Sequence, residues 1–122
     1  MIRAYLAGAY RAPTPEGISA NIALARTAAQ ELWRCGYAVL SPHCNTALFD
    51  GVVSDEQFLE GDIAWLRCAD VMVLMPGWEK SEGTRQEIVV AQTCGIPVMT
   101  LGEAYDAQKV QRRIAGRERA RL

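Results

Sequence analysis

The stretch Asp70-Val71-Met72-Val73-Leu74-Met75 decides the fold class, because five consecutive apolar residues follow a single acidic one. An unbroken apolar run of this length is typical of a strand that is buried on both faces, as strands of parallel sheets are. A strand in a half-exposed sheet would alternate polar and apolar side chains instead. We therefore expect a central strand here, with helices covering both faces of its sheet.

Three further apolar runs, residues 2–7, 37–40 and 97–101, also predict strands. Between the runs, apolar residues recur at helical spacing over residues 18–35, 54–68 and 84–94, and another helix is expected over residues 103–122. Strands that alternate with helices fold by right-handed crossovers into a parallel sheet. The sequence thus predicts one α/β domain over residues 1–122. It should be a three-layer sandwich with a four- or five-stranded parallel sheet, flavodoxin- or Rossmann-like.

Composition limits the classes of partner. The formal net charge of −1 gives no general attraction to nucleic acid or to an anionic membrane. No apolar run approaches the roughly 20 residues that a membrane span needs, and no signal peptide precedes the first strand. We expect a soluble cytoplasmic protein that binds neither nucleic acid nor membrane. The single histidine and the spacing of the cysteines argue against a zinc site, and three of the four cysteines are expected to be small buried residues: Cys35, Cys68 and Cys94.

The segment Ser81-Glu82-Gly83-Thr84-Arg85-Gln86-Glu87 follows the central strand and begins a helix. If Thr84 is the N-cap, Glu87 lies in the first helical turn, where the helix dipole favours its ionised form. Such a carboxylate could be a nucleophile. It could equally complete a capping box by accepting a hydrogen bond from the Thr84 backbone amide. The motif alone leaves both interpretations open.

Four loops are expected to meet at the carboxyl edge of the sheet, namely residues 8–13, 41–46, 76–87 and 102 onward. Their aromatic, cationic and hydroxyl side chains suit a nucleotide-like ligand better than a purely apolar one: Tyr5, Tyr10, Arg11, His43, Asn45, Trp78, Ser81 and Thr84. Asp62 would add a second carboxylate if its helix packs beside this edge, although a mid-helix Asp is also common at the boundary of a buried face. Two carboxylates permit glycosidic chemistry.

Several blocks, in this order and spacing, resemble the nucleoside 2-deoxyribosyltransferase superfamily: Tyr5-Leu6-Ala7-Gly8, Gly36-Tyr37, Pro42-His43, Asp62-Ile63, Ala69-Asp70, Gly83-Thr84-x-x-Glu87-Ile88 and Gly95-Ile96-Pro97-Val98. The resemblance covers residues 2–101. Within the superfamily the chain is most similar to a small bacterial and phage domain family of unassigned function. It is also similar to the 2′-deoxynucleoside 5′-phosphate N-hydrolases.

The resemblance implies a role for each matching residue. Glu87 would be the nucleophile that attacks C1′ of the sugar, Asp62 would assist the leaving base, and Tyr5 would orient the nucleophile. Ser81 and Arg11 match residues with which the N-hydrolases contact a 5′-phosphate. The other substrate-binding positions expected at this edge are Gly8, Tyr10, His43, Trp78, Gly83 and Thr84.

The function expected from this pattern is cleavage or transfer at the N-glycosidic bond of a nucleoside or nucleoside 5′-monophosphate, with no metal or redox cofactor. The resemblance also implies a homodimer or higher homo-oligomer. Two alternatives stay open at this point. One is a nucleotide-binding or sensing module without turnover, and the other is a phosphoribohydrolase-like enzyme, which also has a Gly-Thr-x-x-Glu helix start.

Overall fold

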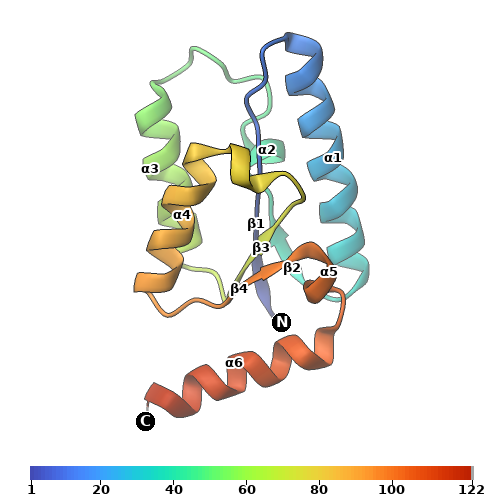
Figure 1. Ribbon diagram of the computed structural model, residues 1–122, viewed down its shortest axis with the longest axis vertical. Helices are drawn as coiled ribbons and strands as arrows, with labels where there is room; N and C mark the ends of the chain where they lie inside the picture. The colour runs from blue at the N-terminus through green and yellow to red at the C-terminus, as the bar shows by residue number, and fades with distance from the viewer. Residues whose placement is uncertain (122) are drawn as a thin grey trace.

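The computed structural model describes residues 1–121, and within them a four-stranded parallel sheet forms the centre of the molecule (Figure 1). Its strands are β1 (Arg3–Ala7), β2 (Ala38–Leu40), β3 (Val71–Leu74) and β4 (Val98–Thr100), in the order β2-β1-β3-β4. In the register, Tyr5 of β1 lies beside Leu40 on one side and Met72 on the other. The predicted fold class is confirmed.

Helices cover both faces of the sheet, which makes three layers. The long helix α1 (Pro15–Arg34) lies on one face, and α3 (Asp55–Leu66) and α4 (Glu82–Thr93) lie on the other (Figure 1). Side chains of β1 alternate between the two cores. Leu6 packs on the α1 side with Leu32, whereas Tyr5 packs on the α3–α4 side with Leu66 and Ala91. This alternation carries Tyr5 towards the helix that bears Glu87.

Two short helical segments interrupt loops that the sequence left irregular. They are α2 (Pro42–Asn45), directly after β2, and the 3₁₀ helix η1 (Trp78–Lys80), after β3. The helix α1 begins three residues earlier than expected, because Thr14 caps it and Pro15 occupies its first position, where the missing N–H costs nothing. The Thr14 side chain accepts a hydrogen bond from the Gly17 amide at 3.1 Å.

The C-terminal segment differs from the single helix expected over residues 103–122. It forms α5 (Leu101–Ala104) and α6 (Ala107–Arg121), and residue 122 lies outside the described part. The side chain and backbone of Glu103 complete a capping box with Thr100, which starts α5 directly at the end of β4. The helix α6 crosses the end of the molecule near the chain's N-terminus, away from the α1 start (Figure 1). Its Val110 is buried in the core on the α1 side.

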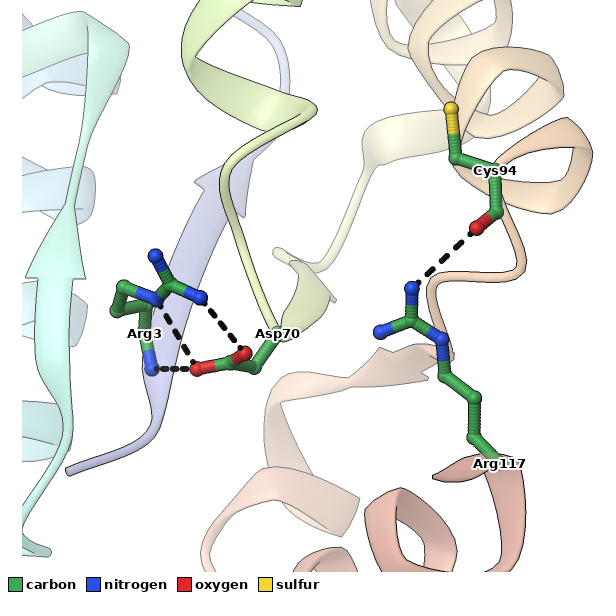
Figure 2. Close-up of polar contacts among 4 residues, drawn as sticks. All are labelled: Arg3, Asp70, Cys94 and Arg117. Carbon is green, nitrogen blue, oxygen red and sulfur yellow. Dashed lines mark hydrogen bonds and ion pairs between the residues drawn. The ribbon is translucent and has the colours of Figure 1, made fainter. Parts of the chain in front are cut away.

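Two arginines of α6 bind backbone carbonyls. Arg117 donates to the Cys94 carbonyl at the end of α4 (3.3 Å, Figure 2), and Arg113 donates to the Val98 carbonyl of β4 (3.2 Å). Cations at a helix C-terminus are favoured by the helix dipole, and a covered carbonyl protects the edge strand β4. Part of the basic C-terminal segment therefore has a structural role.

An ion pair ties the starts of β1 and β3 together at the same end. Asp70 accepts hydrogen bonds from the Arg3 backbone amide (2.8 Å) and from its guanidinium (3.2 and 3.3 Å; Figure 2). Partial burial alone would raise the pKa of Asp70, but the hydrogen bonds from Arg3 outweigh it and hold that pKa below its ordinary value. This ion pair between Arg3 and Asp70 lies at the opposite end of the strands from the candidate site.

The three cysteines expected to be buried, Cys35, Cys68 and Cys94, are not. Cys35, Cys44 and Cys68 are exposed and Cys94 is half-buried. Cys35 and Cys94 are the C-cap residues of α1 and α4, where the chain turns near the surface. Among the described residues there is no group of three or more potential metal ligands. Over the same residues, no helix combines the length and the apolarity that a membrane crossing requires.

Candidate active site

A cavity of about 890 Å³ opens at the carboxyl edge of the sheet. This volume lies in the upper part of the range usual for small-molecule sites. Its walls are the β1–α1 loop, the segment from α2 to α3, and the starts of α3 and α4. Three of the four loops that were expected to meet at this edge line the cavity, namely residues 8–13, 41–46 and 76–87. The last expected loop, from Gly102, instead lines a separate hollow of about 190 Å³.

The helix α4 does not begin as expected. Its N-cap is Ser81, whose side chain accepts a hydrogen bond from the Thr84 amide at 3.2 Å, so Glu82 rather than Arg85 is the first helical residue. Glu87 is thus one turn deeper in the helix than the sequence suggested. The capping box considered for Thr84 and Glu87 does not form, because the Thr84 hydroxyl bonds instead to Gly8 and Ser81.

Glu87 points into the protein rather than towards the helix start. Its side chain is only 7% exposed, and Oε2 accepts a hydrogen bond from the buried Tyr5 hydroxyl. Burial raises the pKa of Glu87 to about 7, an effect that the Tyr5 hydrogen bond opposes and the nearby Asp62 charge increases. The expectation that the helix dipole keeps this group ionised is therefore wrong. The Tyr5 pKa is also raised, by burial and then by the charge of Glu87, so its hydroxyl stays a donor.

Asp62 lies on α3 and lines the same cavity as Glu87. Burial raises its pKa to about 6. The two carboxyl groups therefore lose their protons over neighbouring pH ranges, as an interacting pair. The structure brings together the three residues to which the resemblance assigns catalysis.

Gly8, the residue after β1, is in close contact with Met75 after β3 and with Thr84 of α4. A Cβ atom on Gly8 would lie 2.9 Å from Cβ of Met75, so only glycine fits there. The Gly8 carbonyl accepts the hydroxyl proton of Thr84 at 3.2 Å. The Thr84 hydroxyl also lies 2.9 Å from the Ser81 hydroxyl, whose oxygen accepts the Thr84 amide proton as well. The two hydroxyls thus join the start of α4 to the loop that follows β1.

His43 supports the same loop from α2. It is buried, its Nε2 lies 2.9 Å from the Ala9 carbonyl, and its ring packs edge-on against Tyr10 at 5.5 Å between centroids. Burial lowers the pKa of His43, so the ring is neutral at physiological pH and its Nε2–H donates to Ala9. The Asn21 side-chain amide donates to the Tyr10 carbonyl at 3.0 Å. His43 and Asn21 therefore fix the backbone of this cavity wall.

Two contacts cross from this loop to the segment before α3. The Tyr10 hydroxyl donates to Asp50 at 3.4 Å, and the Arg11 guanidinium forms an ion pair with Asp55. All four residues line the cavity. Arg11, expected to contact a phosphate, already has an anionic partner from the protein.

Trp78 lies outside the cavity. Gly77 adopts a left-handed conformation (φ 85°), and the 3₁₀ turn that follows places Trp78 half-buried against the core on the α3–α4 side. There it lines the small separate hollow. Asn45 does not line the cavity either. The cavity instead includes polar and aromatic residues that the sequence pattern did not single out: Asn21, Asp50, Asp55, Glu56, Phe58, Lys80, Glu82 and Gln86.

Fold and site together define an α/β protein with one buried and one half-buried carboxyl group in a cavity at the carboxyl edge of a parallel sheet. The family model described as "Domain of unknown function (DUF4406)" matches residues 2–100. The chain belongs to this family. A comparison with curated proteins gave no match.

Two solved structures share the fold. One is the 2-deoxyribosyltransferase of the psychrotolerant bacterium Bacillus psychrosaccharolyticus, with a TM-score of 0.61 and 24% identity over 80% of this chain and 70% of that one. The other is the solution structure of BlsM, with a TM-score of 0.62 and 26% identity over 80% of this chain. The chain spans 63% of BlsM. The resemblance seen in the sequence, to a family of unassigned function with the deoxyribosyltransferase fold, is confirmed.

Proposed function

We propose that this protein cleaves or transfers at the N-glycosidic bond of a nucleoside or nucleoside 5′-monophosphate, with Glu87 as the nucleophile. The observation that carries the proposal is the pairing of Glu87 and Asp62 in one cavity, with the Tyr5 hydroxyl bound to a single oxygen of Glu87. The likeness to a 2-deoxyribosyltransferase fold supports the same class of reaction. A pair of carboxyl groups, one acting as nucleophile and the other as proton donor, is the usual arrangement for cleavage of a glycosidic bond.

In the first step, Oε1 of ionised Glu87 attacks C1′ of the sugar. The C1′–N bond breaks, its electron pair stays with the base, and Asp62 gives its proton to that base. Tyr5 holds Oε2, so it fixes the carboxylate plane and leaves Oε1 to form the glycosyl ester. In the second step, ionised Asp62 takes a proton from water or from the N–H of a second base. That nucleophile attacks C1′ and releases Glu87 as a carboxylate.

The remaining side chains would shape and bind the substrate. Gly8, His43, Ser81 and Thr84 hold the walls of the cavity through contacts within the protein. Tyr10 offers an aromatic face to a base or sugar, and Gly83 offers a backbone amide near the start of α4. The homo-oligomer expected from the resemblance stays a prediction.

The proposed chemistry needs one proton shared by the carboxylate pair, which predicts a bell-shaped pH profile. Below about pH 6 both groups are protonated and no nucleophile exists. Above about pH 7 both are ionised and no acid remains. The two values are about one unit apart, so between them the pair holds a single proton, and a minor fraction, roughly one molecule in ten, carries it on Asp62 with Glu87 ionised. We expect kcat/KM to peak between pH 6 and 7, and a profile that is flat from pH 5 to 9 would contradict this assignment.

The proposal is tested by incubating the protein with the 2′-deoxynucleosides, ribonucleosides and their 5′-monophosphates, with and without a free acceptor base. Chromatography then separates the released or exchanged bases. We expect base release from at least one substrate, with exchange if the acceptor is a base. Binding without release from any of these substrates would contradict an enzyme and favour the binding-module alternative.

A further inference from the structure

The charge of the cavity wall is strongly one-sided. Six acidic residues line it, against the two cations Arg11 and Lys80: Asp50, Asp55, Glu56, Asp62, Glu82 and Glu87. Burial keeps Asp62 and Glu87 partly protonated near neutral pH, but four carboxylates still face two cations. A phosphate ester carries up to two negative charges at this pH, and electrostatic repulsion from these carboxylates opposes its entry into the cavity.

One of the two cations that line the cavity, Arg11, is already paired within the protein. Arg11 forms its ion pair with Asp55 at the start of α3, and the two residues are 44 positions apart in the sequence. A phosphate bound by Arg11 would have to compete with Asp55 for the same guanidinium. The adjacent hydrogen bond from Tyr10 to Asp50 joins the same two walls, so this part of the loop is held in place.

The start of α4 offers little compensation. The Ser81 hydroxyl is bonded to both the amide and the hydroxyl of Thr84, and the Thr84 hydroxyl also bonds to the Gly8 carbonyl. An anion at the start of α4 would meet Lys80 and the backbone amides of the first helical turn, next to the carboxylate of Glu82. Lys80 and Glu82 both line this part of the cavity, so its charges are of both signs.

We propose that the cavity takes nucleosides in preference to their 5′-monophosphates, and that Asp55 is the residue that determines this specificity by holding Arg11. The inference deepens the proposed function and rests on it for the ligand class. Asp55 acts through Arg11 and through its own charge. Replacing Asp55 with asparagine removes one negative charge and frees a guanidinium, and both changes favour a phosphate.

The experiment measures dissociation constants by calorimetry for thymidine and 2′-deoxyadenosine, each beside its 5′-monophosphate. The proteins are the wild type, Asp55→Asn, Arg11→Gln/Asp55→Asn and the control Glu60→Gln, which removes an exposed charge from the same helix outside the cavity. We expect the wild type to prefer the nucleoside. Asp55→Asn should shift the ratio of the two constants roughly tenfold towards the monophosphate. The double variant should lose that gain, and Glu60→Gln should keep the wild-type ratio.

The inference is overturned if the wild type binds the monophosphate more tightly, if Asp55→Asn and Glu60→Gln give the same ratio, or if no member of the panel binds. Circular dichroism of each variant shows that the fold is retained, and Arg11→Gln/Asp55→Asn separates an effect through Arg11 from a general charge effect. Because binding is measured, selective binding without base release would contradict the proposed chemistry and leave the specificity assignment standing.

Discussion

Replacing Glu87 with glutamine is expected to lower base release at least about 10³-fold, because the amide cannot form the glycosyl ester. Glutamine has nearly the same shape and still accepts the Tyr5 hydroxyl proton, so ligand binding should change little. The variant should therefore separate binding from turnover. Its activity is measured with whichever substrate the wild-type protein cleaves.

The same substitution should stabilise the folded protein at alkaline pH. The pKa of Glu87 is raised from 4.5 to about 7 on folding, so between these values the folded state holds a proton that the unfolded state has lost. Stability contributed by the protonated group is complete below about pH 4.5 and is lost as the pH rises through 7. Glutamine does not titrate, so at pH 8 the variant should gain up to about 3 kcal/mol and its melting temperature should rise by several degrees.

The control for both effects is Glu79→Gln, which removes an exposed charge from η1 outside the large cavity. It should keep base release and show no stabilisation that grows with pH. A Glu87→Gln protein that unfolds, or that cleaves substrate at the wild-type rate, would show that Glu87 has only a structural role.

Replacing Asp62 with asparagine is expected to lower kcat about 10²- to 10³-fold, since the leaving base would depart without a proton. The alkaline limb of the pH profile should also disappear, because that limb reports ionisation of the acid. The exposed Glu60→Gln on the same helix is the matched control and should leave both unchanged.

A substrate with a cationic leaving base tests the role of Asp62 directly. A 7-methylated purine 2′-deoxynucleoside departs as a neutral base and needs no acid, so Asp62→Asn should lose little activity with it while Glu87→Gln loses nearly all. Equal losses for both substrates in Asp62→Asn would show that Asp62 acts by shaping the cavity and not by proton transfer.

The layered fold could be predicted from the sequence because its signals are local. The run from Val71 to Met75 contains no polar residue, and a strand that is buried on both faces of a parallel sheet requires such an uninterrupted apolar run. The meeting of the strand ends at one edge then follows from the crossover rule. Glu87 and Tyr5 were expected near this edge from the order of the elements, whereas Asp62 joined them only through the family resemblance and on the condition that its helix packs there.

The local geometry of the site could not be predicted, because long-range contacts decide it. Ser81 and Thr84 are both good N-caps by composition, and what selects Ser81 is that Thr84 bonds to Gly8, 76 residues away. The pKa of Glu87 could not be predicted for the same reason. Burial beside Tyr5 raises this pKa, whereas a position in the first turn of the helix would have lowered it.

The place of Asp50 in the cavity could not be predicted, because residues 46–53 carry no periodic pattern. Leu48 adopts a left-handed conformation (φ 64°) and Gly51 another (φ 82°), so this segment follows its own path between α2 and α3. That path brings Asp50 and Asp55 opposite Tyr10 and Arg11. The phosphate contact suggested by Arg11 in the sequence is thus replaced, in our proposal, by a contact within the protein.

The most direct test of the central claim is mass spectrometry of the protein quenched during turnover of a 2′-deoxynucleoside. The account predicts a covalent adduct with the mass of one deoxyribosyl group, located on the peptide that contains Glu87, lost when acceptor base is added and missing in Glu87→Gln. Base release with no adduct on Glu87, or an adduct on another residue, would contradict it.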